Sequence, residues 1–195
     1  MGDESTPSLD SAPHVLGGRY EVLALLGVGG MGAVYKVRDR ELDETVALKM
    51  LKREIADTPG IVERFRREVK LARRVTHPNV ARTYDLGEHA GDRFLTMELI
   101  EGESLATRLA RQGRLSISET IAVVGAICEG LEAAHAAGVV HRDLKPDNVL
   151  LSGSRVVITD FGVARAQEAG AAARTAIPLG TPAYMAPEQV EASQN

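Results

Sequence analysis

Two short apolar segments in the last third of the chain, and the polar residues around them, constrain the fold more than any other feature. Residues 149–151 and 156–158 are apolar and are separated by four residues, Ser-Gly-Ser-Arg. This pattern predicts an antiparallel hairpin with a four-residue loop. Counting outward from the loop pairs the two strands residue for residue, so Asn148 and Asp160 should meet at the open end of the hairpin.

These two side chains have the chemistry of a site for a hard cation. An amide oxygen and a carboxylate held close together suit Mg²⁺, with phosphate oxygens and waters filling the remaining octahedral positions. Asp143 lies five residues before Asn148 and can reach the same place as a base or as a group that positions a nucleophile. A polar turn with capping Asp and Asn residues explains each residue alone, but it explains all three together poorly.

A glycine cluster near the start of the chain is a second candidate site. Residues 27–34 contain the pattern GxGxxGxV between two strand-like segments, 20–26 and 33–37. A dinucleotide-binding turn would be followed by a helix, and a Walker loop would need a lysine where Ala33 stands. A hairpin lid whose backbone amides approach phosphates and a plain mobile glycine turn both fit the pattern.

Lys49 favours the first of these two interpretations. It lies within an apolar strand, 46–51, so its ammonium must either extend to the surface or meet a negative partner inside. We expect that partner to be Glu68, in a helix that starts at Thr58 with Pro59 at its first position and ends near residue 77. Glu68 lies beside the apolar face of this helix, although pairing with Arg64 on the charged face is the alternative.

The remaining patterns complete a strand-rich half and a helix-rich half. Residues 80–86 and 94–99 predict two more strands, which gives a five-stranded sheet with one helix. Ser116 and Glu119 form a capping-box pattern that opens a long helix, and Gly138 ends it as a residue suited to a left-handed conformation.

Composition excludes several other functions. The chain has 195 residues, 44% of them hydrophobic, enough for an ordinary globular core, and its net charge of −4 gives no basic excess for nucleic acid. One cysteine, Cys128, excludes an intrachain disulfide, and we expect it to be a small buried hydrophobic residue. Residues 1–17 predict a disordered polar leader. No apolar run is long enough to cross a bilayer, so we expect a cytoplasmic protein unless a longer parent is membrane-anchored.

Six motifs in this order resemble the eukaryotic-like protein kinase family and are closest in character to bacterial Ser/Thr kinases. The matching residues are the glycine segment 27–34, Val46-Ala47-Leu48-Lys49, Glu68, the segment from His141 to Asn148, Asp160-Phe161-Gly162, and Ala186-Pro187-Glu188. Together they span about residues 19 to 190. The resemblance implies an α+β, bilobal fold with a β-rich N-lobe with one helix at 18–98, a hinge at 99–102, and a partial, mainly helical C-lobe at 103–195.

The resemblance also implies an activity, namely transfer of the γ-phosphoryl group of ATP to Ser and Thr hydroxyls of proteins, with Mg²⁺. Asp143 would position the acceptor and Lys145 would stabilise the transferring group, while Asn148 and Asp160 would hold the metal. The residues implied in ATP binding are Gly27, Val28, Gly29, Gly30, Gly32, Val34, Ala47, Lys49, Glu68, Glu98, Ile100 and Leu150, with Met97 closing the back of the adenine pocket. Thr175 is the candidate phosphoacceptor of the activation segment, with Arg142 as its cationic partner, and a kinase dimer is a further partner that the family suggests.

Two alternatives belong to other classes. A truncated kinase-like module would bind nucleotide or a partner without transferring phosphate, and a dinucleotide-dependent oxidoreductase would use the glycines differently. Only seven residues follow Glu188, whereas the family pattern continues with further helices. We therefore expect the long helix from residue 116 to keep part of its apolar surface uncovered, which would make residues 1–195 alone poorly stable and nearly inactive.

Overall fold

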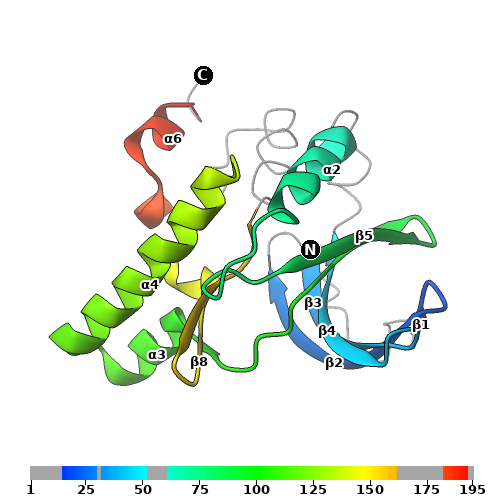
Figure 1. Cartoon of the computed structure of the whole chain (residues 1–195), viewed down its shortest axis with the longest axis horizontal. Helices are drawn as coiled ribbons and strands as arrows, with labels where there is room; N and C mark the ends of the chain where they lie inside the picture. The colour runs from blue at the N-terminus through cyan, green and yellow to red at the C-terminus, as the bar shows by residue number, and fades with distance from the viewer. Residues whose placement is uncertain (1–14, 30–31, 52–60, 162–181, 193–195) are drawn as a thin grey trace, which may run out of the picture. The chain divides into compact units, whose positions relative to one another are not determined.

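The computed structural model describes residues 15–29, 32–51, 61–161 and 182–192, and these form two compact units (Figure 1). Unit 1 contains the described residues up to 51 together with 84–99, and unit 2 contains 61–83 and the described residues from 100 onward. The helix at 61–72 groups with unit 2 rather than with the strands of unit 1. Several predictions lie outside the described residues: those on the leader before residue 15, Gly30, Thr58, Pro59 and Thr175.

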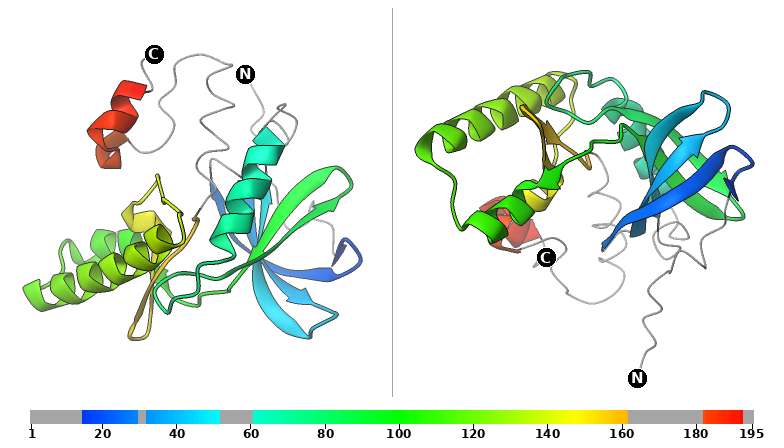
Figure 2. Two further views of the ribbon diagram at one scale, coloured as in Figure 1. Left: turned by 45° about the horizontal axis from the view of Figure 1, so that its top comes forward. Right: turned by 90° about the horizontal axis from the view of Figure 1, so that it is seen from below.

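Unit 1 is built on a strongly twisted antiparallel sheet with the strand order β1-β2-β3-β4-β6-β5 (Figure 2). Its strands are β1 (Val15–Leu16), β2 (Tyr20–Gly29), β3 (Gly32–Asp39), β4 (Glu44–Leu51), β5 (Thr83–His89) and β6 (Asp92–Met97). Five of these strands were predicted from the sequence. The strand β3 directly after the glycines also confirms that this is not a dinucleotide-binding turn, which needs a helix there.

The sixth strand, β1, corrects the prediction that disorder extends to residue 17. Leu16 is almost fully buried and pairs with Tyr20, and Val15 pairs with Glu21. The burial of Leu16 in the core of unit 1, together with the ladder to β2, explains why these residues are ordered. Arg19, in the turn that follows, donates two hydrogen bonds to Asp39 of β3 at 2.6 and 2.8 Å.

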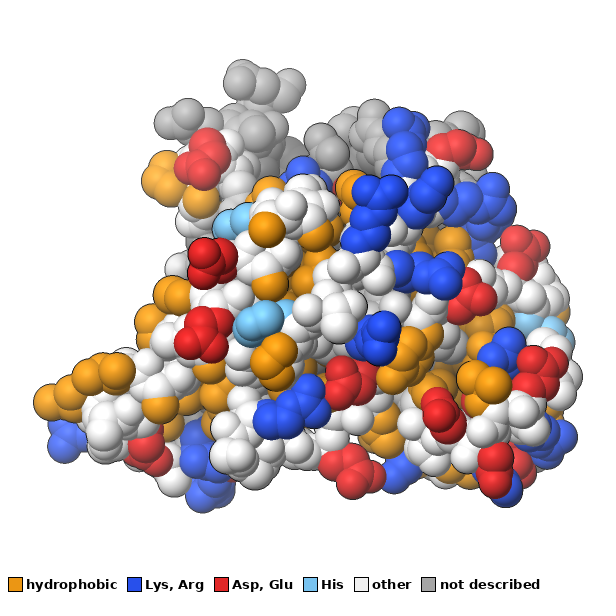
Figure 3. Space-filling model, viewed as in Figure 1, with side chains coloured by type: hydrophobic (Ala, Val, Ile, Leu, Met, Phe, Trp, Pro, Cys, Tyr) orange, Lys and Arg blue, Asp and Glu red, His pale blue; other side chains and the backbone are white. Residues whose placement is uncertain are grey.

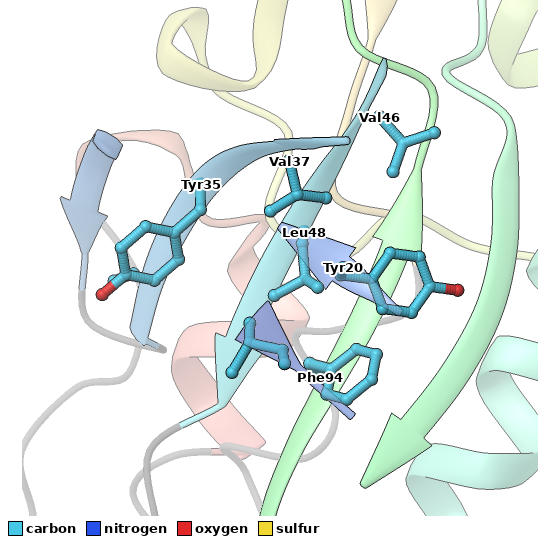
Figure 4. Packing of buried hydrophobic residues seen from close by; sticks show 8 residues of the cluster. Tyr20, Tyr35, Val37, Val46, Leu48 and Phe94 are labelled. Atoms are coloured by element: carbon cyan, nitrogen blue, oxygen red, sulfur yellow. The ribbon is translucent and has the colours of Figure 1, made fainter. Parts of the chain in front are cut away.

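One face of the sheet carries the hydrophobic core of unit 1. Tyr35 and Val37 of β3 lie opposite Leu48 and Val46 of β4, so strand alternation brings all four side chains to this face (Figure 4). The rings of Tyr20 and Phe94 meet edge to face, with centroids 5.5 Å apart. Residues at the alternate positions of the same strands therefore point to the other face, which is the one that matters for the site.

Unit 2 is mainly helical, with a small three-stranded sheet in the order β7-β8-β9. Strand pairing in the hairpin follows the predicted register, since Leu151 pairs with Val156 and Val149 with Ile158. The predicted four-residue loop was wrong, because Ser152 also pairs with Arg155 and leaves a loop of two residues, Gly153 and Ser154. The short β7 and the helix α3 were not predicted. The elements are α2 (Ile61–Ala72), β7 (Glu103–Ser104), α3 (Leu105–Gln112), α4 (Ile117–Ala136), the 3₁₀ helix η2 (Pro146–Asn148), β8 (Val149–Ser152), β9 (Arg155–Ile158), the 3₁₀ helix η3 (Pro182–Tyr184) and α6 (Pro187–Ala192).

Helix α4 begins and ends as predicted. Ser116 and Glu119 make both hydrogen bonds of the capping box, and Gly138 has a φ of 77° just after the helix. Gly130 lets the helix approach the loop before β5 closely, because a Cβ atom there would lie 2.9 Å from the Asn79 carbonyl oxygen. The inner side of α4 packs with β9 around Ala134 and Ile158.

The outer side of α4 carries an exposed apolar row, which we define as Ile117, Ile121, Val124 and Cys128 (Figure 3). The first three residues are 82%, 68% and 51% exposed, which confirms the expectation that apolar surface of this helix stays uncovered. Cys128 belongs to the same row, so the prediction that it is buried was wrong. Its spacing from Ile117, Ile121 and Val124 puts all four residues on one side of the helix.

The charged exterior expected for α2 is also present. Exposed basic side chains follow one another along this helix and just beyond it, and they gather in one area of the surface (Figure 3). They are Arg66, Arg67, Lys70, Arg73 and Arg74. Glu68 is different, because only 12% of its side chain is exposed, which confirms its inward orientation.

Candidate active site

The segment between α4 and β8 is anchored by His141, which is buried. Its Nδ1 accepts the Asp143 backbone N–H at 3.3 Å, so Nε2 carries the proton and donates to the Thr159 carbonyl oxygen at 2.8 Å. Burial lowers the pKa of His141, which keeps the ring neutral, as this bonding pattern requires. The Phe161 ring packs against it at 4.6 Å between centroids. His141 and Phe161 thus support the segment through packing.

Asp143 is held by two side chains that the sequence placed near it. The amide Nδ2 of Asn148 donates to the Asp143 carbonyl oxygen at 2.7 Å and lies 3.3 Å from its carboxylate Oδ2. The Lys145 ammonium lies 3.4 Å from the same Oδ2. The Asp143 carboxylate is therefore fixed beside a cation and a neutral donor, while 19% of its side chain remains exposed.

The two candidate metal ligands come from segments that are joined through the backbone. Thr159 N–H donates to the Asn148 carbonyl oxygen at 2.9 Å, one residue before Asp160. Asp160 has a φ of 64°, a left-handed conformation that is uncommon for residues other than glycine and that occurs often at functional sites. The structure thus brings together Asp143, Lys145, Asn148 and the backbone leading to Asp160, which the sequence predicted as one cluster.

Glu68 reaches the same segment from α2. Its Oε1 accepts a hydrogen bond from Arg142 Nη1 at 3.3 Å, a contact that was not predicted. The chain after α2 is fixed to β9 as well, since Ala81 N–H donates to the Ile158 carbonyl oxygen and Ile158 N–H donates to that of Asn79, both at 2.8 Å. The predicted pair of Glu68 and Lys49 joins residues of different units and stays a prediction.

Gln189 of α6 is a second unpredicted contact of this segment. Its Nε2 donates to the Arg142 carbonyl oxygen at 2.8 Å, and its Oε1 accepts the Ala186 N–H at 3.2 Å. Pro187 at the first helical position and a glutamine at the third are a recognisable helix-start pattern, which was the available signal. The bond to Arg142 spans 47 residues and has no local signal.

In unit 1, the face of the sheet opposite the core carries the predicted adenine and phosphate residues. Val34 lies opposite Lys49, and Ala47 lies opposite Met97, so strand pairing brings these side chains to one face. Leu95 pairs with Lys49 and joins them, although it was not predicted. Side chains in the segment 94–97 alternate between the two faces of the sheet, and Phe94 belongs to the core, so this alternation was the available signal that Leu95 points to the opposite face. Lys49 is thus a buried cation in an otherwise apolar row.

The described glycines lie where β2 and β3 approach each other. Gly27 pairs with Val34, and Gly29 pairs with Gly32, while Val28 between them is half exposed. Gly32 has a φ of 142°, and a Cβ atom there would lie 1.8 Å from the Met50 carbonyl oxygen. Only glycine fits this position, so the backbone at the end of the hairpin stays free of side-chain bulk.

The other predicted nucleotide contacts follow these elements. Glu98 comes directly after β6 and is half-buried, and Ile100 is the first residue of the second segment of unit 2. Leu150 is a half-buried residue of β8 that pairs with Ser104 and Val157. Their contacts with a nucleotide stay predictions. Among the described residues, no group of three or more His, Cys, Asp or Glu side chains is arranged to hold a metal ion, and no helix has the length and apolar character needed to cross a membrane.

Comparison with known proteins decides the family, since a model of the protein kinase domain matches residues 20–195. The chain belongs to the protein kinase domain family. A probable serine/threonine-protein kinase of Bifidobacterium longum, pknA2, is 42% identical over 93% of the chain, and the kinase PknA of Mycobacterium tuberculosis is 41% identical over 89%. The chain spans 24% of the first relative's length and 42% of the second's.

Solved kinase structures confirm the fold. The kinase domain of Mycobacterium tuberculosis PknI superimposes with a TM-score of 0.71 and 34% sequence identity, over 77% of this chain and 61% of that one. The predicted kinase-like α+β fold and the similarity to bacterial Ser/Thr kinases are therefore correct.

Proposed function

We propose that this kinase transfers the γ-phosphoryl group of ATP to serine and threonine hydroxyls of protein substrates. The observation that carries the proposal is the arrangement at Asp143, whose carboxylate lies beside the Lys145 ammonium and the Asn148 amide. A carboxylate fixed in this way accepts the hydrogen bond of an acceptor hydroxyl and orients its oxygen for in-line attack. Lys145 stabilises the negative charge on the transferring group.

The donor set fits a Mg²⁺-nucleotide. Asn148 and Asp160 offer an amide and a carboxylate oxygen, the hard ligands that Mg²⁺ prefers, and the Thr159 bond ties their segments together. Mg²⁺ bound there would neutralise charge on the triphosphate oxygens. In unit 1 the apolar side chains of Val34 and Ala47 suit one face of an adenine ring, with Met97 at the back of its pocket, and the buried Lys49 suits phosphate oxygens.

The activity is tested by separating nucleotide binding from transfer. Asp143→Asn should remove most transfer of labelled γ-phosphate to a generic protein acceptor while the affinity for ATP, measured by calorimetry, stays within a few fold. Lys49→Met should depress transfer through lost phosphate positioning. The matched control is Asp147→Asn, because Asp147 lies close by in the sequence, in η2, and is exposed. We expect its turnover to equal that of the wild-type protein.

Two outcomes would refute parts of this proposal. Equal loss of binding and turnover in Asp143→Asn would place Asp143 at the nucleotide instead of the acceptor. Transfer is measured for the chain alone and for one extended by the further helices of the family pattern. Tight ATP binding with no transfer to any acceptor in either protein would favour the alternative function, a kinase-like module that binds nucleotide or a partner.

We further propose that Thr175 is the phosphoacceptor of the activation segment and that Arg142 binds its phosphate. The support is the position of Arg142 next to Asp143, together with the strength of guanidinium–phosphate pairing. In the structure this guanidinium binds Glu68. Phosphopeptide mapping of active protein that found Thr175 unmodified and another residue modified would overturn this assignment.

A further inference from the structure

Gln189 contacts the peptide group that immediately precedes the proposed catalytic carboxylate. The Arg142 carbonyl and the Asp143 N–H belong to one planar unit, whose oxygen and hydrogen point in opposite directions. Gln189 Nε2 donates to the oxygen at 2.8 Å, and the hydrogen is donated to His141 Nδ1 at 3.3 Å. This peptide group is therefore held on both sides, by α6 and by the buried histidine.

A peptide group in this place needs such support. Arg142 has a φ of 66°, a left-handed conformation that residues other than glycine rarely adopt unless surrounding contacts hold them in it. Rotation of the peptide group would change the direction in which the Asp143 side chain leaves the backbone. It would also turn the carboxylate away from Lys145 and Asn148.

The orientation of the Gln189 amide follows from its two partners. A carbonyl oxygen only accepts and a backbone N–H only donates, so the nitrogen must face Arg142 and the oxygen must face Ala186. The oxygen completes half of a capping box, because Gln189 is the third residue of α6 and Ala186 precedes the helix. Glutamate would serve this cap equally well, but only glutamine can also donate to Arg142.

We propose that Gln189 is a positioning residue for phosphoryl transfer: it links α6 to the catalytic segment and holds the Arg142–Asp143 peptide group in its working orientation. The role in turnover rests on the proposed kinase activity, whereas the bridge itself does not. Gln189 touches neither nucleotide nor acceptor in this role and acts through Asp143.

Two substitutions separate the bridge from the helix cap. Gln189→Glu keeps the bond to Ala186 and loses the one to Arg142, whereas Gln189→Met loses both. We expect Gln189→Glu to lower kcat about fivefold to tenfold, the size of effect expected from one lost hydrogen bond, with the KM for ATP within twofold of wild type. Gln112→Glu, the same change at the exposed end of α3, is the matched control and should leave kcat unchanged.

Amide hydrogen exchange tests the bridge without any need for activity. In Gln189→Glu, exchange of the Asp143 amide should accelerate at least threefold while the α6 amides keep their wild-type rates. In Gln189→Met, both regions should exchange faster. If Gln189→Glu matches wild type in kcat and in exchange at Asp143, Gln189 is only a helix cap and the proposal is wrong. If neither the wild-type chain nor one extended by the further helices of the family pattern transfers phosphate, the proposed function fails, and the exchange comparison alone decides whether Gln189 holds this peptide group.

Discussion

Replacing Asn148 by aspartate tests the arrangement around Asp143 most directly, because it changes charge and almost no volume. The Asn148 Nδ2 lies 2.7 Å from the Asp143 carbonyl oxygen and 3.3 Å from its carboxylate Oδ2. Asn148→Asp removes both donated bonds and puts a second carboxylate beside the first. Asn148 itself is only 7% exposed, so water screens the new charge weakly.

Two competing costs set the size of the effect. At the 3.3 Å separation, two unit charges repel by about 5 kcal/mol at an effective dielectric constant of about 20. Protonating the new carboxyl instead costs about 4 kcal/mol at pH 7, since its reference pKa is about 3.9 and each unit is worth about 1.4 kcal/mol. The molecule adopts the cheaper solution, so we expect up to about 4 kcal/mol of destabilisation at pH 7, reduced by the attraction of Lys145.

The pH dependence identifies this cause. The introduced carboxyl has a higher pKa in the folded protein than in the unfolded chain, so its penalty is present at neutral pH and shrinks as the pH falls toward the unfolded value. Between pH 7 and pH 5 the free-energy deficit relative to wild type should decrease by about 1.4 kcal/mol per unit. Asn148→Ala removes the same bonds without adding charge, so its deficit of about 1–3 kcal/mol should not follow pH.

Urea unfolding of the three proteins at pH 5, 6, 7 and 8 measures these differences. The result that would refute the reasoning is an Asn148→Asp deficit that equals that of Asn148→Ala and stays constant with pH. Asn148 would then not face the Asp143 carboxylate in solution.

Three further predictions concern the frame that supports the site. Gly32→Ala should lower the free energy of unfolding by about 2–4 kcal/mol, because it combines a strained φ with a clash against the Met50 carbonyl oxygen, and thermal denaturation would measure it. Arg19→Met should lower the free energy of unfolding by about 2–3 kcal/mol, because the Asp39 carboxylate, whose pKa Arg19 holds below its usual range, loses its bidentate partner. The loss is smaller than for a fully buried ion pair because Arg19 is a third exposed, and an unchanged urea midpoint would contradict this prediction. Burial lowers the pKa of His141 below its unfolded value near 6.5, so the unfolded chain binds a proton at a higher pH than the folded protein does. The free energy of unfolding of the wild-type protein should therefore decrease by up to about 1.4 kcal/mol between pH 7 and pH 5.5, and His141→Gln should lack this decrease.

The hairpin and the cluster around Asp143 were predictable because short-range chemistry determines them. Two apolar segments only four residues apart pair in one register, even though the loop itself has two residues, Gly153 and Ser154, and Asn148 lies only five residues from Asp143. The strand β1 was missed, since two residues carry no periodic pattern and their order depends on packing of Leu16 in the core.

Contacts between distant segments were beyond the reach of the sequence pattern. Arg142 binds Glu68 across 74 residues and Gln189 across 47, and neither spacing leaves a local mark. The prediction that Cys128 is buried was wrong for a different reason. Helical periodicity shows which apolar residues share a side of α4, but it does not tell whether anything covers that side.

The position of Cys128 makes the protein easy to label with a fluorophore at a single site. It is the only thiol in the chain and lies exposed on α4 next to Val124. A maleimide-linked, environment-sensitive fluorophore would therefore attach at one defined place in the wild-type protein without any engineered substitution. A blue shift on mixing with a candidate partner would report that the apolar row of α4 had lost its contact with water, and the rate of thiol labelling would give an independent measure of the same event.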